Sequence, residues 1–140
     1  MITLGREFYV QTTHARHIPF NEVSTGFLFE AMLTSPDSAV FVIEQDGQVV
    51  GGIGGTLSAA TYNFDCRVVM ENFWFITSSC RGSLEAVRLI RTLEKWSAHN
   101  GAALIMLGAF DHLRSSALGK LYTKMGYEAS EHVFVKGVSQ

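Results

Sequence analysis

The chain has 140 residues, of which 47% are hydrophobic, and this suits one domain with its own core over residues 1–140. Its formal charge of −2 argues against the broad basic surface that binds nucleic acid. The sequence has no signal peptide and no apolar run of about 20 residues, so we expect no membrane partner. The two cysteines, Cys66 and Cys80, lack metal-ligand spacing and fit a reducing cytoplasm, with no metal site.

The first 35 residues are expected to form a strand and a helix. The run from Phe8 to Thr13 predicts the strand. Pro19 can occupy the first turn of a helix that continues to about Leu33, because proline is tolerated there. The apolar residues of this helix lie at helical spacing: Val23, Phe27, Leu28 and Ala31. The helix is rich in phenylalanine and could form a homodimer face or pack into the core.

A β-hairpin is predicted next. Ala39 to Glu44 and Gln48 to about Leu57 flank Asp46-Gly47, which is a strong turn pair. Glycines are unusual inside a strand, and four occur here: Gly51, Gly52, Gly54 and Gly55. They indicate a bulge, or a close approach by another backbone or a ligand. They do not form a P-loop, because no Gly-Lys-Ser/Thr follows.

A further strand and the clearest helix follow. A turn at Tyr62 to Asp65 leads into a strand from Arg67 to Ile76. After a turn of small polar residues, a helix is predicted by an apolar stripe with a spacing near 3.6: Ala86, Leu89, Ile90, Leu93 and Ser97. Asn100-Gly101 ends it.

The last third of the chain completes the expected fold. The apolar run from Ala102 to Leu107 predicts a fully buried strand. Ser115 or Ser116 can cap a short helix that Gly126 ends. Its inward residues are predicted to be Ala117, Leu118, Leu121, Tyr122 and Met125. Tyr127 to Val138 is predicted to contain a final strand. This order of elements predicts a mixed sheet with helices packed on it, an α/β or α+β domain.

The turn before the clearest helix is the segment most informative about chemistry. It ends in Arg81-Gly82-Ser83. A strand that enters a helix through small residues aims backbone N–H groups at one point, where the helix dipole adds partial positive charge. Gly82 lets a ligand approach the backbone, and Arg81 can add charge. The turn can therefore bind a pyrophosphate, although an ordinary connection with a solvated arginine has the same pattern.

Three segments resemble the GCN5-related N-acetyltransferases, the GNAT superfamily. The turn and the helix start resemble its motif Arg/Gln-x-x-Gly-x-Gly/Ala, with Arg81 first and Ala86 last. Leu121-Tyr122-Thr-Lys-Met-Gly126-Tyr127 resembles the family's late Leu-Tyr-x-x-x-Gly-Phe segment, and Gln45 to Gly52 its early hairpin. The segments come in the family's order and cover most of residues 40–135. Arg-Gly-Ser-Leu also resembles members from phage and prophage genomes.

The resemblance implies a fold and a cofactor. The GNAT fold has a mixed, mostly antiparallel sheet whose fourth and fifth strands splay apart, with flanking helices. Acetyl-coenzyme A (acetyl-CoA) runs along the fourth strand, and its pyrophosphate rests on the turn. The resemblance therefore implies a cofactor-binding set in this chain: Phe75, Ile76, Thr77, Arg81, Gly82, Ser83, Leu84, Ala86 and Val87.

The resemblance also implies two catalytic residues. Tyr122 matches a tyrosine that protonates the leaving thiolate, and a phenol of pKa about 10 can protonate a nearby thiolate of pKa about 8–9. Glu71 lies where family members place a glutamate that takes a proton from the amine, often through water. The alternatives are a packed aromatic for Tyr122 and a carboxylate that binds a cationic substrate for Glu71. Among the five histidines, His112 is nearest to the expected cleft.

We therefore expect an acetyl-CoA-dependent N-acetyltransferase whose acceptor, an unidentified small-molecule or peptide amine, attacks the thioester directly. Leu84 stands where the family usually has glycine, and Glu85 where it usually has an apolar residue. These departures favour an alternative, a GNAT-shaped binding or virion-associated module without turnover. An unrelated α/β binding domain is a third, weaker possibility.

Overall fold

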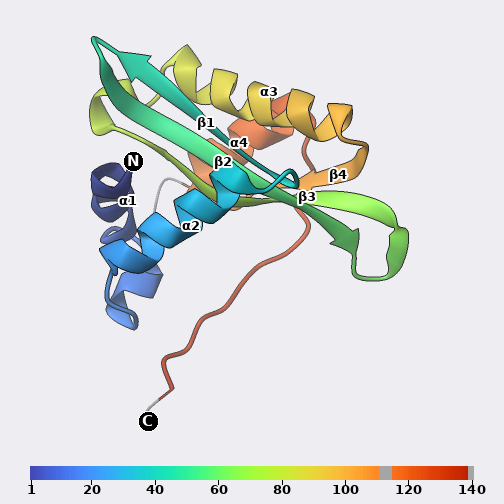
Figure 1. Cartoon of the computed structure of the whole chain (residues 1–140), viewed down its shortest axis with the longest axis horizontal. Helices are drawn as coiled ribbons and strands as arrows, with labels where there is room; N and C mark the ends of the chain where they lie inside the picture. Colours follow the sequence, from blue (N-terminus) through green and yellow to red (C-terminus); the bar gives the residue numbers. More distant parts are fainter. Residues whose placement is uncertain (111–114, 139–140) are drawn as a thin grey trace.

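The computed structural model describes residues 1–110 and 115–138. In chain order its elements are α1 (Ile2–Tyr9), η1 (Thr13–Arg16), α2 (Glu22–Thr34), β1 (Ser38–Gln45), β2 (Gln48–Ala60), β3 (Asn63–Ile76), η2 (Ser78–Cys80), α3 (Leu84–His99), β4 (Ala102–Met106) and α4 (Ser115–Met125). Within the described residues the strands form one sheet in the order β1-β2-β3-β4. Only β3 and β4 pair in parallel, so the predicted mixed, mostly antiparallel sheet with flanking helices is confirmed (Figure 1).

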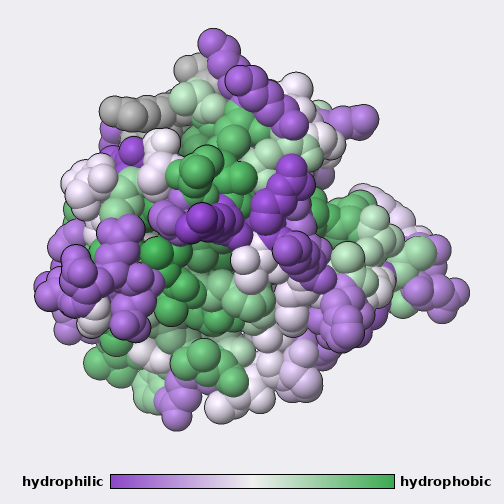
Figure 2. Space-filling view, turned by 90° about the horizontal axis from the view of Figure 1, so that it is seen from above, coloured by the Kyte–Doolittle hydropathy of each residue, from purple (hydrophilic) through white to green (hydrophobic). Residues whose placement is uncertain are grey.

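The helices cover the two faces of the sheet in pairs. Helices α3 and α4 lie on one face, and α1 and α2 lie on the other (Figure 1). The end of the β2–β3 hairpin extends beyond β1 and β4 and forms the lobe at the right of Figure 2, where Tyr62 and Phe64 are exposed. Strand β3 begins at Asn63, earlier than predicted, because the turn needs only Thr61 and Tyr62.

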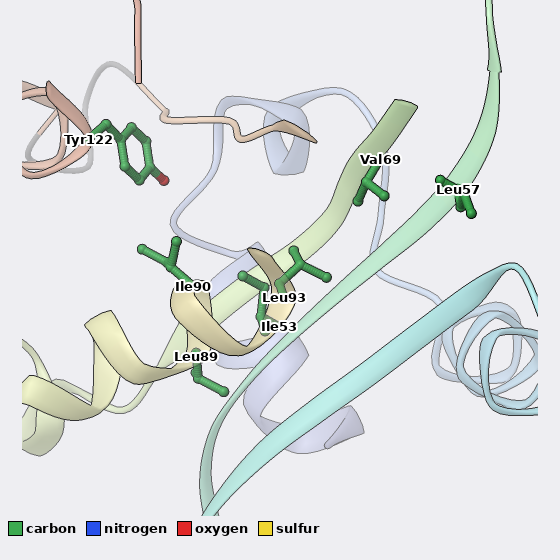
Figure 3. Close-up of a cluster of buried hydrophobic side chains, with 7 residues drawn as sticks. All are labelled: Ile53, Leu57, Val69, Leu89, Ile90, Leu93 and Tyr122. Carbon is green, nitrogen blue, oxygen red and sulfur yellow. The ribbon is translucent and has the colours of Figure 1, made fainter. Parts of the chain in front are cut away.

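The core lies between the sheet and the α3–α4 layer. It contains seven buried residues: Ile53, Leu57, Val69, Leu89, Ile90, Leu93 and Tyr122 (Figure 3). The predicted inward stripe of α3 is confirmed in full, since Ala86, Leu89, Ile90, Leu93 and Ser97 are all buried. Each fully buried leucine or isoleucine stabilises the fold by about 1.5–3 kcal/mol. This burial anchors α3 and fixes the position of the turn that precedes it.

The glycines of β2 mark a close approach of side chains. A Cβ added at Gly54 would clash with the ring of Phe73 and would lie 2.9 Å from the terminal methyl of Met32. A Cβ at Gly52 would lie 2.9 Å from the terminal methyl of Met1. The predicted bulge is also present, because Gly54 pairs with Phe73 and Gly55 pairs with Glu71, which leaves Asn72 as an extra residue on β3. The glycines thus let α1 and α2 pack directly on the sheet.

Two predictions for the first third of the chain are wrong. Phe8 belongs to helix α1 and not to a strand, because one face of α1 packs on β3: the rings of Phe8 and Phe75 lie side by side, and a Cβ added at Gly5 would lie 3.9 Å from the Phe75 ring. Helix α2 begins after Asn21, whose side chain accepts the Ser24 N–H at 2.9 Å, so Pro19 precedes the helix.

The inward face of α2 also differs from the prediction. The residues at the predicted spacing, Val23, Phe27, Leu28 and Ala31, are all exposed. Met32 is buried, and Phe29 packs edge-on against Phe73. Apolar residues occur all round this helix, so helical spacing alone could not identify the buried face.

Two predictions for the last third of the chain are wrong as well. Strand β4 is not fully buried, because Leu104 and Met106 are exposed on the outermost strand. No strand forms over the described residues 127–138, where the chain is extended but unpaired. The predicted inward residues of α4 are confirmed except for Ala117, which is exposed, while Leu118, Leu121 and Met125 pack against the core.

Candidate active site

The strands β3 and β4 separate and form an open V. They pair over only four positions, from Arg67 opposite Ala102 to Met70 opposite Met106. Strand β3 then continues to Ile76. Beyond Met70, within the described residues, it pairs with β2 and no longer with β4. These are the predicted fourth and fifth strands, since the first predicted strand is a helix. The V leaves one edge of β3 open to a ligand.

Gly108 holds the two predicted catalytic residues together at the base of the V. The Glu71 carboxylate accepts the Gly108 N–H at 3.0 Å. The Tyr122 hydroxyl donates to the Gly108 carbonyl, also at 3.0 Å. The acid and the base proposed from sequence thus approach the same peptide segment from β3 and from α4. The importance of Gly108 was missed in the sequence, although its place directly after the apolar run of β4 marks the point where the strands part.

The environment of Glu71 suits a base at neutral pH. Burial raises the pKa of its carboxyl from 4.5 to about 7, and the hydrogen bond from Gly108 partly opposes this rise. A carboxylate with such a pKa is substantially ionised at pH 7 and still basic enough to take a proton from an amine. The arrangement therefore permits general-base chemistry at this position.

Tyr122 projects from α4 into the core cluster (Figure 3). Its side chain is only 9% exposed. Burial is the main cause of a raised pKa of its hydroxyl, and the charge on Glu71 adds to the rise. The hydroxyl therefore remains protonated. To reach a sulfur atom, it must exchange its bond to the Gly108 carbonyl for a bond to the new acceptor.

Four of the predicted cofactor-binding residues line one cavity: Phe75, Ile76, Thr77 and Arg81. The cavity is also lined by Leu4, Glu7 and Phe8 of helix α1 and by Gln11, which follows that helix. The ring centroid of Phe8 lies 6.1 Å from that of Phe75 and 5.9 Å from that of Phe110, which follows β4. Phe8 thus lies between the end of β3 and the segment that follows β4. The predicted residues Gly82, Ser83, Leu84, Ala86 and Val87 lie outside this cavity, along the turn and the first turn of α3.

The backbone groups of the last residues of β3 face in different directions. The Thr77 N–H donates to the Val50 carbonyl of β2 at 2.8 Å, so it faces away from the V. Because backbone groups alternate along a strand, the N–H and C=O of Ile76 and Trp74 face the open edge. Of the predicted strand residues, Ile76 is therefore the one whose main chain can pair with an extended ligand.

The turn before α3 is built by three residues with distinct tasks. Gly82 adopts a φ of +81°, which favours glycine, although there is space for a Cβ. Ser83 caps the helix, since its side chain accepts the Glu85 N–H at 3.3 Å and its own N–H donates to the Cys80 carbonyl. Arg81 is exposed, and its guanidinium donates to the side-chain oxygen of Gln11 at 3.3 Å.

Leu84 and Glu85, the two residues that depart from the family motif, do not block access to the turn before α3. Leu84 is 73% exposed at the first position of α3, so it does not pack into the core. Glu85 forms an ion pair with Arg88 one turn later, at 2.7 Å. Ala86 is buried against the sheet side of the helix and Val87 is half-buried.

Exposure of Leu84 leads to a stability prediction. Replacing Leu84 by Gly should lower the free energy of unfolding by about 1 kcal/mol or less, the cost of glycine in a helix. The loss should be smaller than the cost of truncating a leucine in the core, which is about 2–5 kcal/mol. Urea unfolding at neutral pH measures the difference, with Leu89→Gly, at a buried position of the same helix, as the contrasting variant. A loss for Leu84→Gly as large as that of Leu89→Gly would contradict the prediction.

Other candidate groups are less informative. His112 lies outside the described residues, as do the side chains proposed to cap α4. Trp74 was not singled out from the sequence, yet its ring centroid lies 6.1 Å from that of Tyr122, and its buried indole N–H has no hydrogen-bond partner in the described structure. Within residues 1–110 and 115–138, no three His, Cys, Asp or Glu side chains cluster as a metal site would require. No helix there could cross a bilayer.

Comparison with known proteins identifies the family. The family model for an acetyltransferase (GNAT) domain matches residues 36–129, about two thirds of the chain. The chain belongs to the GNAT acetyltransferase family. The matched region contains the V, the turn and α4 together. Searching curated proteins finds no further match.

Solved structures have the same fold at low sequence identity. An aminoglycoside acetyltransferase from an uncultured soil metagenomic sample superposes with a TM-score of 0.71 at 21% identity, over 98% of this chain and 86% of that one. A Pyrococcus furiosus protein described as an acetyl transferase gives 0.73 at 21%, over 98% and 91%. The aminoglycoside N-acetyltransferase AAC(6')-Iy in complex with CoA gives 0.73 at 18%, over 96% and 86%.

Proposed function

We propose that this GNAT protein transfers the acetyl group of acetyl-CoA directly to an amine. The observation that carries the proposal is the meeting of Glu71 and Tyr122 at Gly108, where β3 and β4 separate. An ionisable carboxylate and a protonated phenol beside an open strand edge are the groups that aminolysis of a thioester needs. The presence of CoA in a neighbour with this fold supports the choice of acyl donor.

The residues that would hold acetyl-CoA are inferred from the hydrogen-bonding groups that the site leaves available to a ligand. The backbone of Ile76 pairs with an extended ligand along β3. The first N–H groups of α3 have no partners within the helix, and together with Arg81 they bind a pyrophosphate. When bound, acetyl-CoA supplies an activated acyl carbon and a thiolate leaving group.

The protein then needs only two proton transfers. Glu71 accepts a proton from the amine as the nitrogen bonds to the thioester carbon. A backbone N–H on the open edge of β3, that of Trp74 or Ile76, stabilises the oxyanion that forms as the carbon becomes tetrahedral. The C–S bond breaks, and Tyr122 gives its proton to the departing sulfur. The tyrosinate recovers a proton from solvent, and Glu71 releases one.

The acceptor is proposed to be a small-molecule amine. Two of the structural neighbours are aminoglycoside acetyltransferases, and a third is a metagenomic aminoglycoside acetyltransferase in complex with sisomicin. A peptide amine is the second option. An assay of free CoA release with a panel of polyamines, aminoglycosides and peptides distinguishes the two classes of acceptor. The two free cysteines, Cys66 and Cys80, agree with a cytoplasmic setting.

Cofactor binding tests the proposal. Acetyl-CoA should raise the melting temperature, because any ligand of the native state does so, whereas free pantetheine should raise it much less. Arg81→Ala should weaken acetyl-CoA binding by about 1–3 kcal/mol, the range for a charge-assisted contact. Arg91→Ala is the matched control, since this exposed arginine lies two turns further along α3 and pairs with Glu94.

A negative result has a definite meaning. If millimolar acetyl-CoA leaves the melting temperature unchanged, the proposed activity is wrong. If Arg81→Ala and Arg91→Ala weaken binding equally, Arg81 has no special contact with the phosphates and the loss reflects general charge.

A binding module without turnover is the second candidate. It is favoured by one contact in the site, since the Arg81 guanidinium that is proposed to bind the pyrophosphate is bound to Gln11. Such a module would show a thermal shift with acetyl-CoA but no release of CoA with any amine of the panel.

A further inference from the structure

The indole N–H of Trp74 is a buried donor without an acceptor. It has no hydrogen-bond partner within the described residues. An indole nitrogen can only donate, so an acceptor atom is needed to satisfy it. Leaving such a group unpaired costs stability, and folded proteins pair the great majority of their buried polar groups. An exception beside an active site is therefore a candidate contact for a ligand.

Trp74 lies on the part of β3 that borders the V. It follows Met70, the last residue of β3 that pairs with β4. Its neighbours Phe73 and Phe75 pack their rings against α2 and α1. Because side chains alternate along a strand, the indole lies on the opposite face, where it packs against the buried core under α3 and α4. The indole is thus beside the V and on the same side of the sheet as α4.

Helix α4 places Tyr122 next to this indole. The centroids of the two rings lie 6.1 Å apart. The Tyr122 hydroxyl donates to the Gly108 carbonyl at 3.0 Å, and the other buried core residues against which Trp74 packs are apolar. A buried water needs about two to four polar partners, and these surroundings offer few. The acceptor for the indole N–H is therefore expected on a ligand in the V.

We propose that the indole N–H of Trp74 donates a hydrogen bond to a carbonyl of the pantetheine arm of acetyl-CoA, that of the amide nearest the sulfur. The inference rests on the proposed function, in which the arm extends along the open edge of β3. Two methylene groups separate this amide from the sulfur that Tyr122 protonates. Since the rings of Tyr122 and Trp74 are adjacent, an acid at the sulfur and a donor at the amide suit neighbouring groups of one arm.

The indole N–H can be observed directly by NMR. Trp74 and Trp96 are the two tryptophans of the chain, so a nitrogen-15 correlation spectrum has two indole signals. Spectra of Trp74→Phe and Trp96→Phe assign them. Adding CoA to the parent protein should move the Trp74 indole proton downfield, because a hydrogen bond deshields it, and should slow its exchange with solvent. The Trp96 signal should stay in place, and adenosine 3′,5′-bisphosphate, which lacks the pantetheine arm, should move neither.

Calorimetric titration of the variants measures the contribution of this contact to binding. Trp74→Phe keeps an aromatic ring and removes the N–H, so it should weaken acetyl-CoA and CoA alike, by about tenfold, and leave adenosine 3′,5′-bisphosphate binding unchanged. KM for acetyl-CoA should rise with kcat nearly unchanged, because the lost contact is made before and during the reaction. Trp96→Phe on α3 is the matched control, since this ring also packs against the core, and it should keep the parent affinity.

The possible failures are distinguishable. If CoA binds to the parent protein and the Trp74 signal does not move, the inference is overturned and the proposed function stands. A loss of affinity for acetyl-CoA alone would place the N–H on the thioester carbonyl. A fall in kcat with unchanged binding would mean that Trp74 only packs against Tyr122. Either result overturns the inference, whereas a parent protein that binds no CoA contradicts the proposed function and the inference with it.

Discussion

Tyr122→Phe is expected to lower turnover about 10²–10⁴-fold, the usual span for loss of a general acid, and to leave acetyl-CoA affinity nearly unchanged. The ring stays, so its packing among the core residues is kept. Only the hydroxyl bond to the Gly108 carbonyl is lost, which costs stability about 1 kcal/mol. The measurement is kcat for CoA release with an accepted amine, together with a thermal-shift titration with acetyl-CoA.

Tyr127→Phe provides the matched control for this change. The ring of Tyr127 lies 5.6 Å from that of Tyr122, but it is the Tyr122 hydroxyl that is bound to Gly108. Removal of the Tyr127 hydroxyl should therefore leave turnover unchanged. If Tyr122→Phe also keeps its turnover, water protonates the thiolate, and Tyr122 is a packed aromatic only.

Glu71→Gln is expected to lower kcat/KM about 10²-fold or more at neutral pH and to change the shape of its pH profile. Only the ionised carboxylate can act as a base, so kcat/KM of the parent protein should rise with pH through about 7, the raised pKa of Glu71. Glutamine cannot titrate, so kcat/KM of the variant should lack this rise near pH 7. The exposed Glu44→Gln on β1 is the control and should keep the parent profile. If kcat/KM of Glu71→Gln still rises near pH 7, another group is responsible for the titration.

The same pKa predicts a pH dependence of stability. Burial raises the pKa of Glu71 in the folded state above its ordinary value of 4.5, so between pH 4.5 and about 7 the folded protein retains a proton that the unfolded chain has lost. The unfolding free energy that Glu71 contributes is therefore present below pH 4.5 and is lost as pH rises through about 7. At pH 8, Glu71→Gln should be more stable than the parent protein by about 1–3 kcal/mol, and near pH 4 the two should be similar. Urea unfolding at the two pH values measures the difference.

Sequence reasoning was most successful where a residue pattern has only one structural solution. The stripe from Ala86 to Ser97 has a single period and a polar opposite face, so it predicted both the helix and its buried side. Asp46-Gly47 predicted the β1–β2 hairpin, because both residues adopt the positive φ that this turn requires. Gly82 and Ser83 predicted the start of α3 for similar local reasons.

It was least successful where a segment depends on a distant partner. Helix α2 is apolar all round, and its buried face is decided by the space that Gly54 leaves beneath Met32. Phe8 lies in a helix because that helix can pack its ring against Phe75 and Phe110, which are far apart in the sequence. Residues 127–138 have the composition of a strand but pair with no strand within the part of the chain that the structure describes.

The sequence by itself determined the mixed sheet and the turn before α3, because local spacing and turn chemistry record these features. Its resemblance to the GNAT family marked Glu71 and Tyr122 as candidate groups. The tertiary structure alone decided that Glu71 and Tyr122 meet at Gly108 and that Arg81 is bound by Gln11. These contacts join residues 14 to 70 positions apart, and such distances close only when the sheet and both helix layers have formed.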